Sequence, residues 1–334
     1  MLYFEQQQRA RAQTWRLLFL FALTVLGLLI AVNLALAMTW RLVAMGSAGY
    51  PAYFFTVNTA MTLLFVFGGW WIEGSALGGG GEKMARRAGA REARTAINAA
   101  EQKFCNIVAE LAIAASMRPP TPMVVEHVDA INAFACGWDE DDAVVAVTSG
   151  ALDYLTRDEL QGLVAHELSH LREGDTRLNM RLAGMVFGLE MIFNLGSTMC
   201  EPDDMRNRTL LALPGFAIKA TGSMGWLAGR ALKAAVSRQR EYLADARAVQ
   251  FTRSKDGLGG VLRKIVGQQG AGATQRGFHP SVQHMLLVNA DTEARRFASH
   301  PPLAERIRRI YGRSMSALNP RPENGGVMRP DAFF

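Results

Sequence analysis

The chain alternates long apolar runs with polar segments, and the lengths of these runs predict how it is built. Residues 17–38 are 22 consecutive residues without a charge. A helix of that length spans about 33 Å, which is enough to cross a hydrocarbon core of about 30 Å. A second uncharged run covers residues 52–72 and has aromatic side chains at both ends, as is typical of helices that end at lipid interfaces. We therefore expect two membrane-spanning helices.

A cleaved signal peptide is the alternative for the first run, because Ala35-Leu36-Ala37 resembles a cleavage site. The run is longer than the apolar core of a signal peptide, and a second span follows it directly. We therefore favour a retained anchor.

Two later apolar stretches, 182–199 and 209–229, are less uniform. Glu190 interrupts the first, and Pro214 and Lys219 interrupt the second. Ionisable groups are costly inside a bilayer but are tolerated where they face protein. Two interpretations stay open: a membrane-inserted helical hairpin, which we favour, and a buried or lipid-grazing hairpin.

The segments between these runs predict a small folded domain. Glycines at 74–81 predict a flexible joint, and residues 83–117 carry apolar side chains at helical spacing. Short apolar runs at 123–128, 132–136 and 143–148 predict the strands of a small sheet.

A strong helix-start signal follows these strands. Thr156 and Glu159 have the spacing of a capping box, in which each side chain binds the other residue's backbone N–H. Apolar residues at helical spacing continue to Gly174, where the helix should end. The fold class that we expect is mainly α with a small β-sheet, an α+β arrangement.

Charge and composition narrow the function. The net charge is +6, and residues 1–100 hold nine basic and four acidic side chains. These basic residues flank apolar runs, whereas a nucleic-acid-binding protein carries its charge on a folded face, so we expect a lipid bilayer and no nucleic acid as partner. The positive-inside rule places the N-terminus and everything after residue 73 in the cytoplasm. Cys105, Cys136 and Cys200 form no CxxC pair, which disfavours a disulfide framework or a zinc ribbon.

The helix that begins at the capping box carries the sequence His166-Glu167-Leu168-Ser169-His170. Residues four apart lie on one helical face, so both imidazoles can reach one tetrahedral ion. Glu167 is placed where a carboxylate can accept a proton from an activated water. We therefore expect His166 and His170 to bind a metal and Glu167 to act as general base.

A catalytic zinc ion needs a third protein ligand and one open position. Glu241 and Asp245 are four residues apart on a predicted helix, so one could bind the metal while the other orients a ligand histidine. A solvated helix face is the better explanation of the pair when it is taken alone. The apolar hairpin changes this balance, because a chain that runs out and back returns next to the histidine helix.

These motifs together resemble the HtpX family of membrane zinc metallopeptidases, which is related to the CAAX prenyl endopeptidases. The resemblance covers residues 85–312 and the two-span N-terminus. It rests on five stretches of this sequence: Asn132-Ala-Phe-Ala-Cys-Gly137, Val147-Thr-Ser-Gly-Ala-Leu152, Ala165-His-Glu-Leu-Ser-His170 with Gly174-Asp175, Arg240-Glu-Tyr-Leu-Ala-Asp245 and His300-Pro-Pro-Leu-Ala-Glu-Arg306. Cys136 departs from the family pattern, which has Thr or a small residue there.

The resemblance implies one Zn²⁺ per chain, bound by His166, His170 and Glu241, with Asp245 holding a histidine ligand. It also implies a zincin-like fold, four membrane helices, a multi-pass protein of the bacterial cell membrane with a cytoplasmic active site, and a stress-response role in degrading misfolded or membrane proteins. The corresponding segments are a two-span anchor (1–74), a linker and helix (75–118), a first zincin half (119–176), the apolar hairpin (177–231), a second zincin half (232–314) and a disordered tail (315–334).

Two further roles complete this hypothesis. The oxyanion that forms during peptide hydrolysis needs a second electrophile, for which the resemblance suggests His300 and Arg306, with His279 and His284 as rivals. Residues Asn132, Ala133, Phe134 and Ala135 could form an edge strand that pairs with an extended substrate through main-chain hydrogen bonds.

Three alternatives share much of this pattern: a quality-control endopeptidase, a processing protease for one substrate, and an inactive membrane scaffold with structural zinc. Structural zinc sites are usually closed by four protein ligands that include cysteine, and no cysteine lies at ligand spacing here. We therefore favour the enzyme. The sequence does not predict the oligomeric state.

Overall fold

The computed structural model describes residues 2–44, 49–200, 208–270, 286–287 and 301–320. The chain divides into two compact units. Unit 1 contains residues 1–78 and 180–233, and unit 2 contains residues 79–179 and 234–334.

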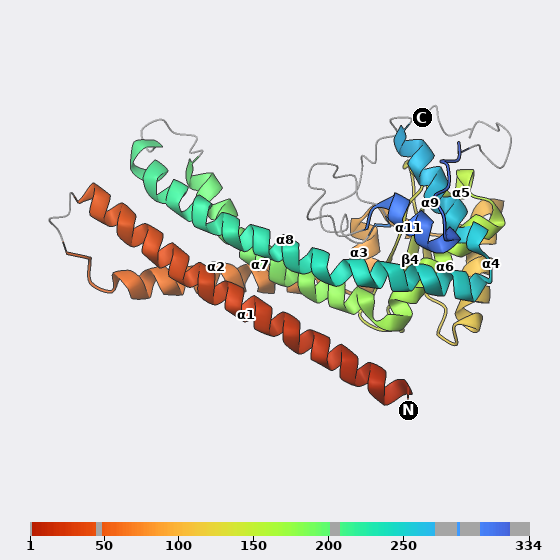
Figure 1. Ribbon diagram of the computed structural model, residues 1–334, viewed down its shortest axis with the longest axis horizontal. Coiled ribbons are helices and arrows are strands. Elements are labelled where there is room, and N and C mark those ends of the chain that lie inside the picture. Colours follow the sequence, from red (N-terminus) through yellow and green to blue (C-terminus); the bar gives the residue numbers. More distant parts are fainter. Residues whose placement is uncertain (1, 45–48, 201–207, 271–285, 288–300, 321–334) are drawn as a thin grey trace. The chain divides into compact units, whose positions relative to one another are not determined.

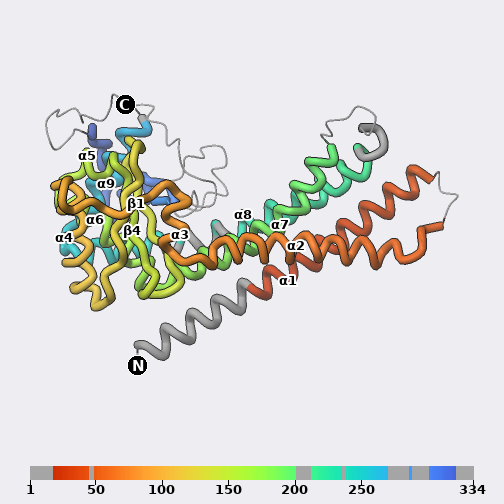
Figure 2. Tube along the Cα trace, turned by 180° about the vertical axis from the view of Figure 1, so that it is seen from behind, coloured from red at the N-terminus to blue at the C-terminus, as the bar shows by residue number. Residues whose placement is uncertain are grey.

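Unit 1 is helical. It contains α1 (Leu2–Val43), α2 (Phe54–Leu77) and most of α7 (Asp175–Cys200), together with the first part of α8 (Arg208–Thr252). Its apolar core is formed by one face of α1, with Phe21, Val25, Leu28 and Val32, packed with Val66 of α2 and Leu189 of α7. Figures 1 and 2 show α7 and α8 side by side, as expected for a helical hairpin.

Glycines allow close helix packing in unit 1. A Cβ added at Gly188 of α7 would lie 2.3 Å from the carbonyl oxygen of Val66 in α2. A Cβ at Gly196 of α7 would lie 2.3 Å from the backbone nitrogen of Lys219 in α8. Small residues at such contacts are typical of helices packed within a membrane.

Three described helices are long and apolar enough to cross a membrane, namely Leu18–Val43, Phe54–Leu77 and Asp175–Cys200. The apolar stretch at 209–229 lies in α8, which is not among these three helices and which carries Lys219 within the stretch.

Unit 2 contains a four-stranded mixed sheet in the order β1-β2-β4-β3. The strands are β1 (Ala90–Glu92), β2 (Thr121–Val125), β3 (Ala133–Cys136) and β4 (Val144–Thr148). β2 and β4 are parallel, while β1 and β3 pair antiparallel with β2 and β4. All five residues of β4 are buried, which fits a central strand rich in valine. β3 is an edge strand.

Helices pack around this sheet and enclose an apolar cluster. They are α3 (Gly80–Arg87), α4 (Ala99–Ala114), α5 (Ser149–Tyr154), α6 (Arg157–Glu173), α9 (Lys255–Gly270) and α11 (Leu303–Tyr311). α6 is the central helix, because its side chains Leu160, Leu163, Val164 and Leu168 lie fully within the cluster. The expected α+β fold with N-terminal apolar helices is thereby confirmed.

The capping box on α6 is confirmed. The Thr156 hydroxyl accepts from the backbone N–H of Glu159, and the Glu159 carboxylate accepts from that of Thr156. α6 ends at Glu173, followed by Gly174 in the left-handed conformation with φ 71°. Both ends of the helix were therefore predicted correctly.

The apolar spacing over 83–117 predicts a helical stretch, but in the structure a strand interrupts it. α3 ends at Arg87, Gly89 has φ +85°, and the chain then forms β1 before α4 begins. Asn98 caps α4 by accepting from the backbone N–H groups of Ala100 and Glu101. The glycine-rich joint is also shorter than expected, because α2 extends to Leu77 and α3 begins at Gly80.

The end of the described chain contacts α9. The carbonyl of Ser316 accepts from the Arg263 side chain at 2.8 Å, and the N–H of Leu318 donates to the Arg263 carbonyl at 3.1 Å. Residues 321–334 of the expected disordered tail lie outside the described residues.

Candidate metal centre

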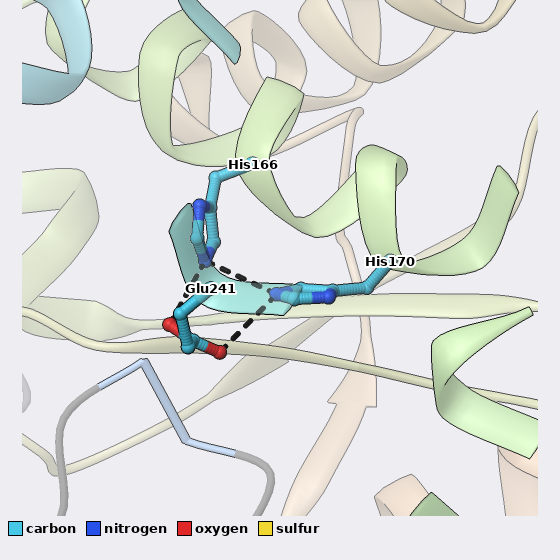
Figure 3. Close-up of side chains that lie close together, drawn as sticks. All are labelled: His166, His170 and Glu241. Carbon is cyan, nitrogen blue, oxygen red and sulfur yellow. Dashed lines mark hydrogen bonds and ion pairs between the residues drawn. The ribbon is translucent and has the colours of Figure 1, made fainter. Parts of the chain in front are cut away.

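Helix α6 places two histidines on one buried face. His166 and His170 are one turn apart, and their Nε2 atoms lie 3.2 Å from each other. Their rings meet edge to face, with centroids 4.8 Å apart. Figure 3 shows both rings directed toward the same point. Two imidazole nitrogens that close together in a buried site suit a shared cation.

Glu241 of α8 reaches the same point. Its Oε1 lies 3.5 Å from Nε2 of His170, and its Oε2 lies 3.7 Å from Nε2 of His166 (Figure 3). Ligand atoms held about 2.0–2.1 Å from a tetrahedral zinc ion are about 3.3 Å apart, so this spacing fits such an ion. The three residues could therefore hold a metal ion.

Each histidine also has a carboxylate at its other ring nitrogen. Nδ1 of His166 lies 3.1 Å from Oδ1 of Asp245, and Nδ1 of His170 lies 2.9 Å from Oδ2 of Asp175. Carboxylates in this position fix the tautomer of a metal-binding histidine. Asp175 is a functional candidate that the sequence motifs did not predict. One sequence feature could have indicated it: Asp175 comes directly after Gly174, the glycine that ends the histidine helix.

Arg306 of α11 is fully buried beside these carboxylates. Its Nε and Nη2 donate to the two oxygens of Asp245 at 2.9 and 2.7 Å, and its Nη1 lies 3.2 Å from Oε2 of Glu241. Burial alone would lower the pKa of Arg306, but these carboxylates raise it above its ordinary value. Burial alone would raise the pKa of Asp245, but Arg306 and His166 hold it below the usual range.

The expected role of Arg306 toward an oxyanion remains a prediction. In the structure its guanidinium binds carboxylates, and its Nη2 lies 3.5 Å from Nε2 of His166. The other expected electrophile, His300, and its rivals His279 and His284 lie outside the described residues.

Glu167 lies on α6 between the two histidines and is 2 % exposed. Burial raises the pKa of its carboxyl group to about 7, while a hydrogen bond from the backbone of Ala135 in β3 partly opposes this rise. A carboxyl group with a pKa near neutrality can both accept and return a proton at physiological pH.

The strand expected to bind substrate is next to this carboxylate. Asn132, Ala133, Phe134 and Ala135 are all buried. The carbonyl of Ala133 accepts a hydrogen bond from the backbone N–H of Leu287 at 3.0 Å, and the carbonyl of Leu287 accepts one from Arg306 at 3.4 Å. The outer edge of β3 is thus occupied at Ala133 by another part of the chain.

Cys136 ends the same strand. Its thiol donates to the carbonyl of Gly81 at 3.3 Å, and burial raises its pKa to about 12. The thiol therefore stays protonated at neutral pH, which makes it a buried filler rather than a reactive group.

A capped helix with two histidines one turn apart, completed by a glutamate from a distant helix, is typical of metal-dependent peptidases. Residues 98–314 match Peptidase family M48, and the chain belongs to this family. It is a protease in which the three residues described above could bind the metal.

Several curated relatives are named "Protease HtpX homolog". The relative from Dictyoglomus turgidum is 35% identical over 219 residues, which cover 61% of this chain and 67% of the relative. The relative from Thermoanaerobacter pseudethanolicus is 34% identical over 221 residues, covering 63% and 71%. The relative from Streptococcus uberis is 31% identical over 221 residues, covering 62% and 72%. The family resemblance found in the sequence is confirmed.

Proposed function

We propose that this protein is a membrane-anchored zinc endopeptidase that hydrolyses peptide bonds of misfolded or membrane proteins. The observation that carries the proposal is the convergence of His166, His170 and Glu241, with Glu167 buried beside them. The names of the relatives support the protease class.

His166, His170 and Glu241 would hold the metal. Nitrogen and carboxylate donors in near-tetrahedral spacing favour zinc over magnesium or calcium, which take more oxygen ligands. A bound zinc ion would polarise a substrate carbonyl and lower the pKa of a water molecule to about 7.

The remaining roles belong to side chains of this chain. Glu167 accepts a proton from the attacking water and later returns it to the leaving amine, because it is buried and close to the ligand histidines. Asp245, whose Oδ1 lies 3.1 Å from Nδ1 of His166, would keep the proton of this ring on Nδ1 and leave Nε2 free to bind a metal. Arg306 neutralises the buried carboxylates of Asp245 and Glu241.

The protein is proposed to sit in the bacterial cell membrane with its N-terminus and peptidase unit in the cytoplasm. The apolar helices Leu18–Val43 and Phe54–Leu77 would be the first two spans. Basic residues before the first span and after the second support this orientation. α7 and α8 would add a hairpin in the same membrane.

An extended substrate would pair with the outer edge of β3. Leu287 already makes one hydrogen bond there, and a substrate strand would replace it. A non-hydrolysable peptide bound to the Glu167→Gln variant should therefore speed amide exchange at Leu287. Unchanged exchange at Leu287 with the peptide at saturation would contradict pairing at this edge.

The enzyme proposal is tested with Glu167→Gln in the purified full-length protein. We expect casein hydrolysis to fall at least 100-fold, because the general base is lost while the side chain keeps its shape. Zinc content should stay at one ion per chain. Glu110→Gln is the control, since Glu110 forms only an exposed ion pair with Arg157. If Glu167→Gln is as active as wild type, the enzyme proposal is wrong and the inactive membrane scaffold is the better explanation.

A dedicated processing protease would use the same groups. Comparison of cleaved proteins in cells with wild type or Glu167→Gln separates the two: many accumulating substrates support quality control, and a single one supports processing.

A further inference from the structure

Asp175 is a buried carboxylate that the proposed mechanism does not use. It is the first residue of α7 and is 4 % exposed. Gly174 takes the left-handed conformation and turns the chain after α6, which brings Oδ2 of Asp175 to 2.9 Å from Nδ1 of His170. The negative charge of a buried carboxylate must be compensated by neighbouring groups, because burial of an unpaired charge is costly.

The second partner of Asp175 is Arg240. Nη1 of Arg240 forms an ion pair with Oδ1 of Asp175, so the two carboxylate oxygens bind two different groups. Arg240 directly precedes Glu241, whose Oε1 lies 3.5 Å from Nε2 of His170. Neighbouring residues of α8 therefore restrain His170 on both sides of its ring, one directly and one through Asp175.

The same arrangement occurs around the other histidine. Asp245 contacts Nδ1 of His166, and its oxygens also bind Arg306. Each histidine thus has a carboxylate at Nδ1, and each carboxylate has an arginine behind it.

We propose that Asp175 is a positioning residue of the metal centre and that Arg240 orients it. Asp175 holds the proton of His170 on Nδ1 and leaves the lone pair of Nε2 directed at the metal, while Arg240 fixes the carboxylate in that orientation. This inference rests on the proposed metal-dependent function.

A purely structural role is the competing explanation, because an acidic residue at the start of α7 also stabilises a helix N-terminus. The substitution Asp175→Asn distinguishes the two. Asparagine keeps the size and an acceptor oxygen but removes the charge, so a loss of stability is expected under both explanations, whereas a loss of zinc affinity is expected only for a positioning role. Its amide can instead donate to Nδ1 of His170, which would favour the tautomer that cannot bind a metal through Nε2.

The experiment measures zinc affinity of the purified full-length protein by competition with a chromophoric chelator, independently of peptidase activity. We expect Asp175→Asn to weaken zinc binding about 10- to 100-fold. Arg240→Gln should weaken it less, and Arg240→Lys should recover part of the loss. In the Co²⁺-substituted protein, Asp175→Asn should also shift the visible absorption spectrum.

The matched control is Glu173→Gln. Glu173 lies at the same end of α6 and pairs with Arg247 at 2.5 Å, and among the described residues it forms no ion pair with either histidine. Its neutralisation should leave zinc affinity within about 2-fold of wild type.

Wild-type zinc affinity in Asp175→Asn, with or without a lower unfolding midpoint, would overturn the positioning role. This failure differs from failure of the proposed function. If wild type binds zinc and loses activity in Glu167→Gln while Asp175→Asn binds zinc normally, only the inference about Asp175 is wrong. If wild type binds no zinc, the metal-dependent function itself is wrong.

Discussion

The two units of this protein distribute apolar and charged side chains in opposite ways. In the described residues, every large hydrophobic side chain that is exposed lies in unit 1, except Ile97, Ile113 and Leu243. Among the residues whose burial is described, every buried charged side chain lies in unit 2. Leu34 in α1 is 60 % exposed, for example, whereas Arg306 in α11 is completely buried.

This difference is expected if unit 1 is surrounded by lipid and unit 2 by water. Helices of unit 1 expose leucine, isoleucine and phenylalanine because lipid is as apolar as these side chains, so their packing depends on close contact at small residues. In unit 2, the apolar residues cluster around α6. The charged residues of the candidate metal centre are buried beside this cluster, and a buried charge must pair with an opposite charge to be stable. Stability should therefore depend on charge pairing in unit 2 and on glycine contacts in unit 1.

The largest effect on stability is expected for Arg306→Met in unit 2. The substitution keeps much of the side-chain volume but leaves Asp245 and Glu241 buried without their guanidinium partner. Loss of one partner from a buried ion pair costs about 3–5 kcal/mol. We expect a large fall in the thermal unfolding midpoint of unit 2, together with weaker zinc binding.

Arg308→Met on the same helix is the control, because Arg308 is exposed and pairs only with Glu305. Its effect should stay below about 1 kcal/mol. Equal midpoints for the two variants would show that the buried pairs in unit 2 do not govern its stability.

A smaller effect is expected for Gly188→Ala in unit 1. The new methyl group would lie 2.3 Å from the carbonyl oxygen of Val66, so α2 and α7 must separate. Overpacking of this kind costs about 1–3 kcal/mol. The loss of stability is measured by unfolding the full-length protein in mixed micelles with an increasing fraction of denaturing detergent. The zinc content per folded chain should not change.

Gly68→Ala provides the comparison within α2, because a Cβ at Gly68 has no atom within 4 Å. It should be neutral or slightly stabilising, since alanine favours helix more than glycine does. If both alanine variants behave alike, close contact between α2 and α7 is not what stabilises unit 1.

The sequence predicted the parts of the site that depend on local spacing. His166 and His170 are one helical turn apart, and Thr156 and Gly174 mark the two ends of that helix, so short-range rules were sufficient. The structure also brings Glu241 to these histidines. This proximity depends on the path of the hairpin, and spacing alone left it undecided.

Other features carried no periodic signal. β1 has the sequence Ala90-Arg91-Glu92, too short and too polar to show the alternation of a strand, and it forms only because β2 offers a partner. The burial of Arg306 against Asp245 joins residues 61 positions apart, and no pattern along the chain encodes that contact. Asp175 is different, since its place after Gly174 was visible but its partners were not.

The smallest effect is expected at Glu101, a buried charge of unit 2 that is distant in sequence from the residues that could bind a metal. Its carboxylate accepts from Nη1 and Nη2 of Arg91 at 2.9 and 2.7 Å and from the backbone N–H of Arg94 at 2.5 Å. Burial alone would raise its pKa, but these donors hold the pKa below its ordinary value of 4.5. The ionised form therefore stabilises the fold above about pH 4.5, and this contribution is lost as the pH falls through the lower pKa of the folded state.

Glu101→Gln should accordingly lower the unfolding midpoint at neutral pH by an amount that corresponds to about 1 kcal/mol. The difference from wild type should shrink as the pH falls below 4.5, because the wild-type side chain then becomes neutral as well. Glu110→Gln, at an exposed position on the same helix, should show no such pH-dependent difference. If the difference in unfolding midpoint between Glu101→Gln and wild type stays constant from pH 7 to pH 3, the shape of the Glu101 side chain and not its charge stabilises the fold. Charge pairing would then stabilise unit 2 only at the candidate metal centre.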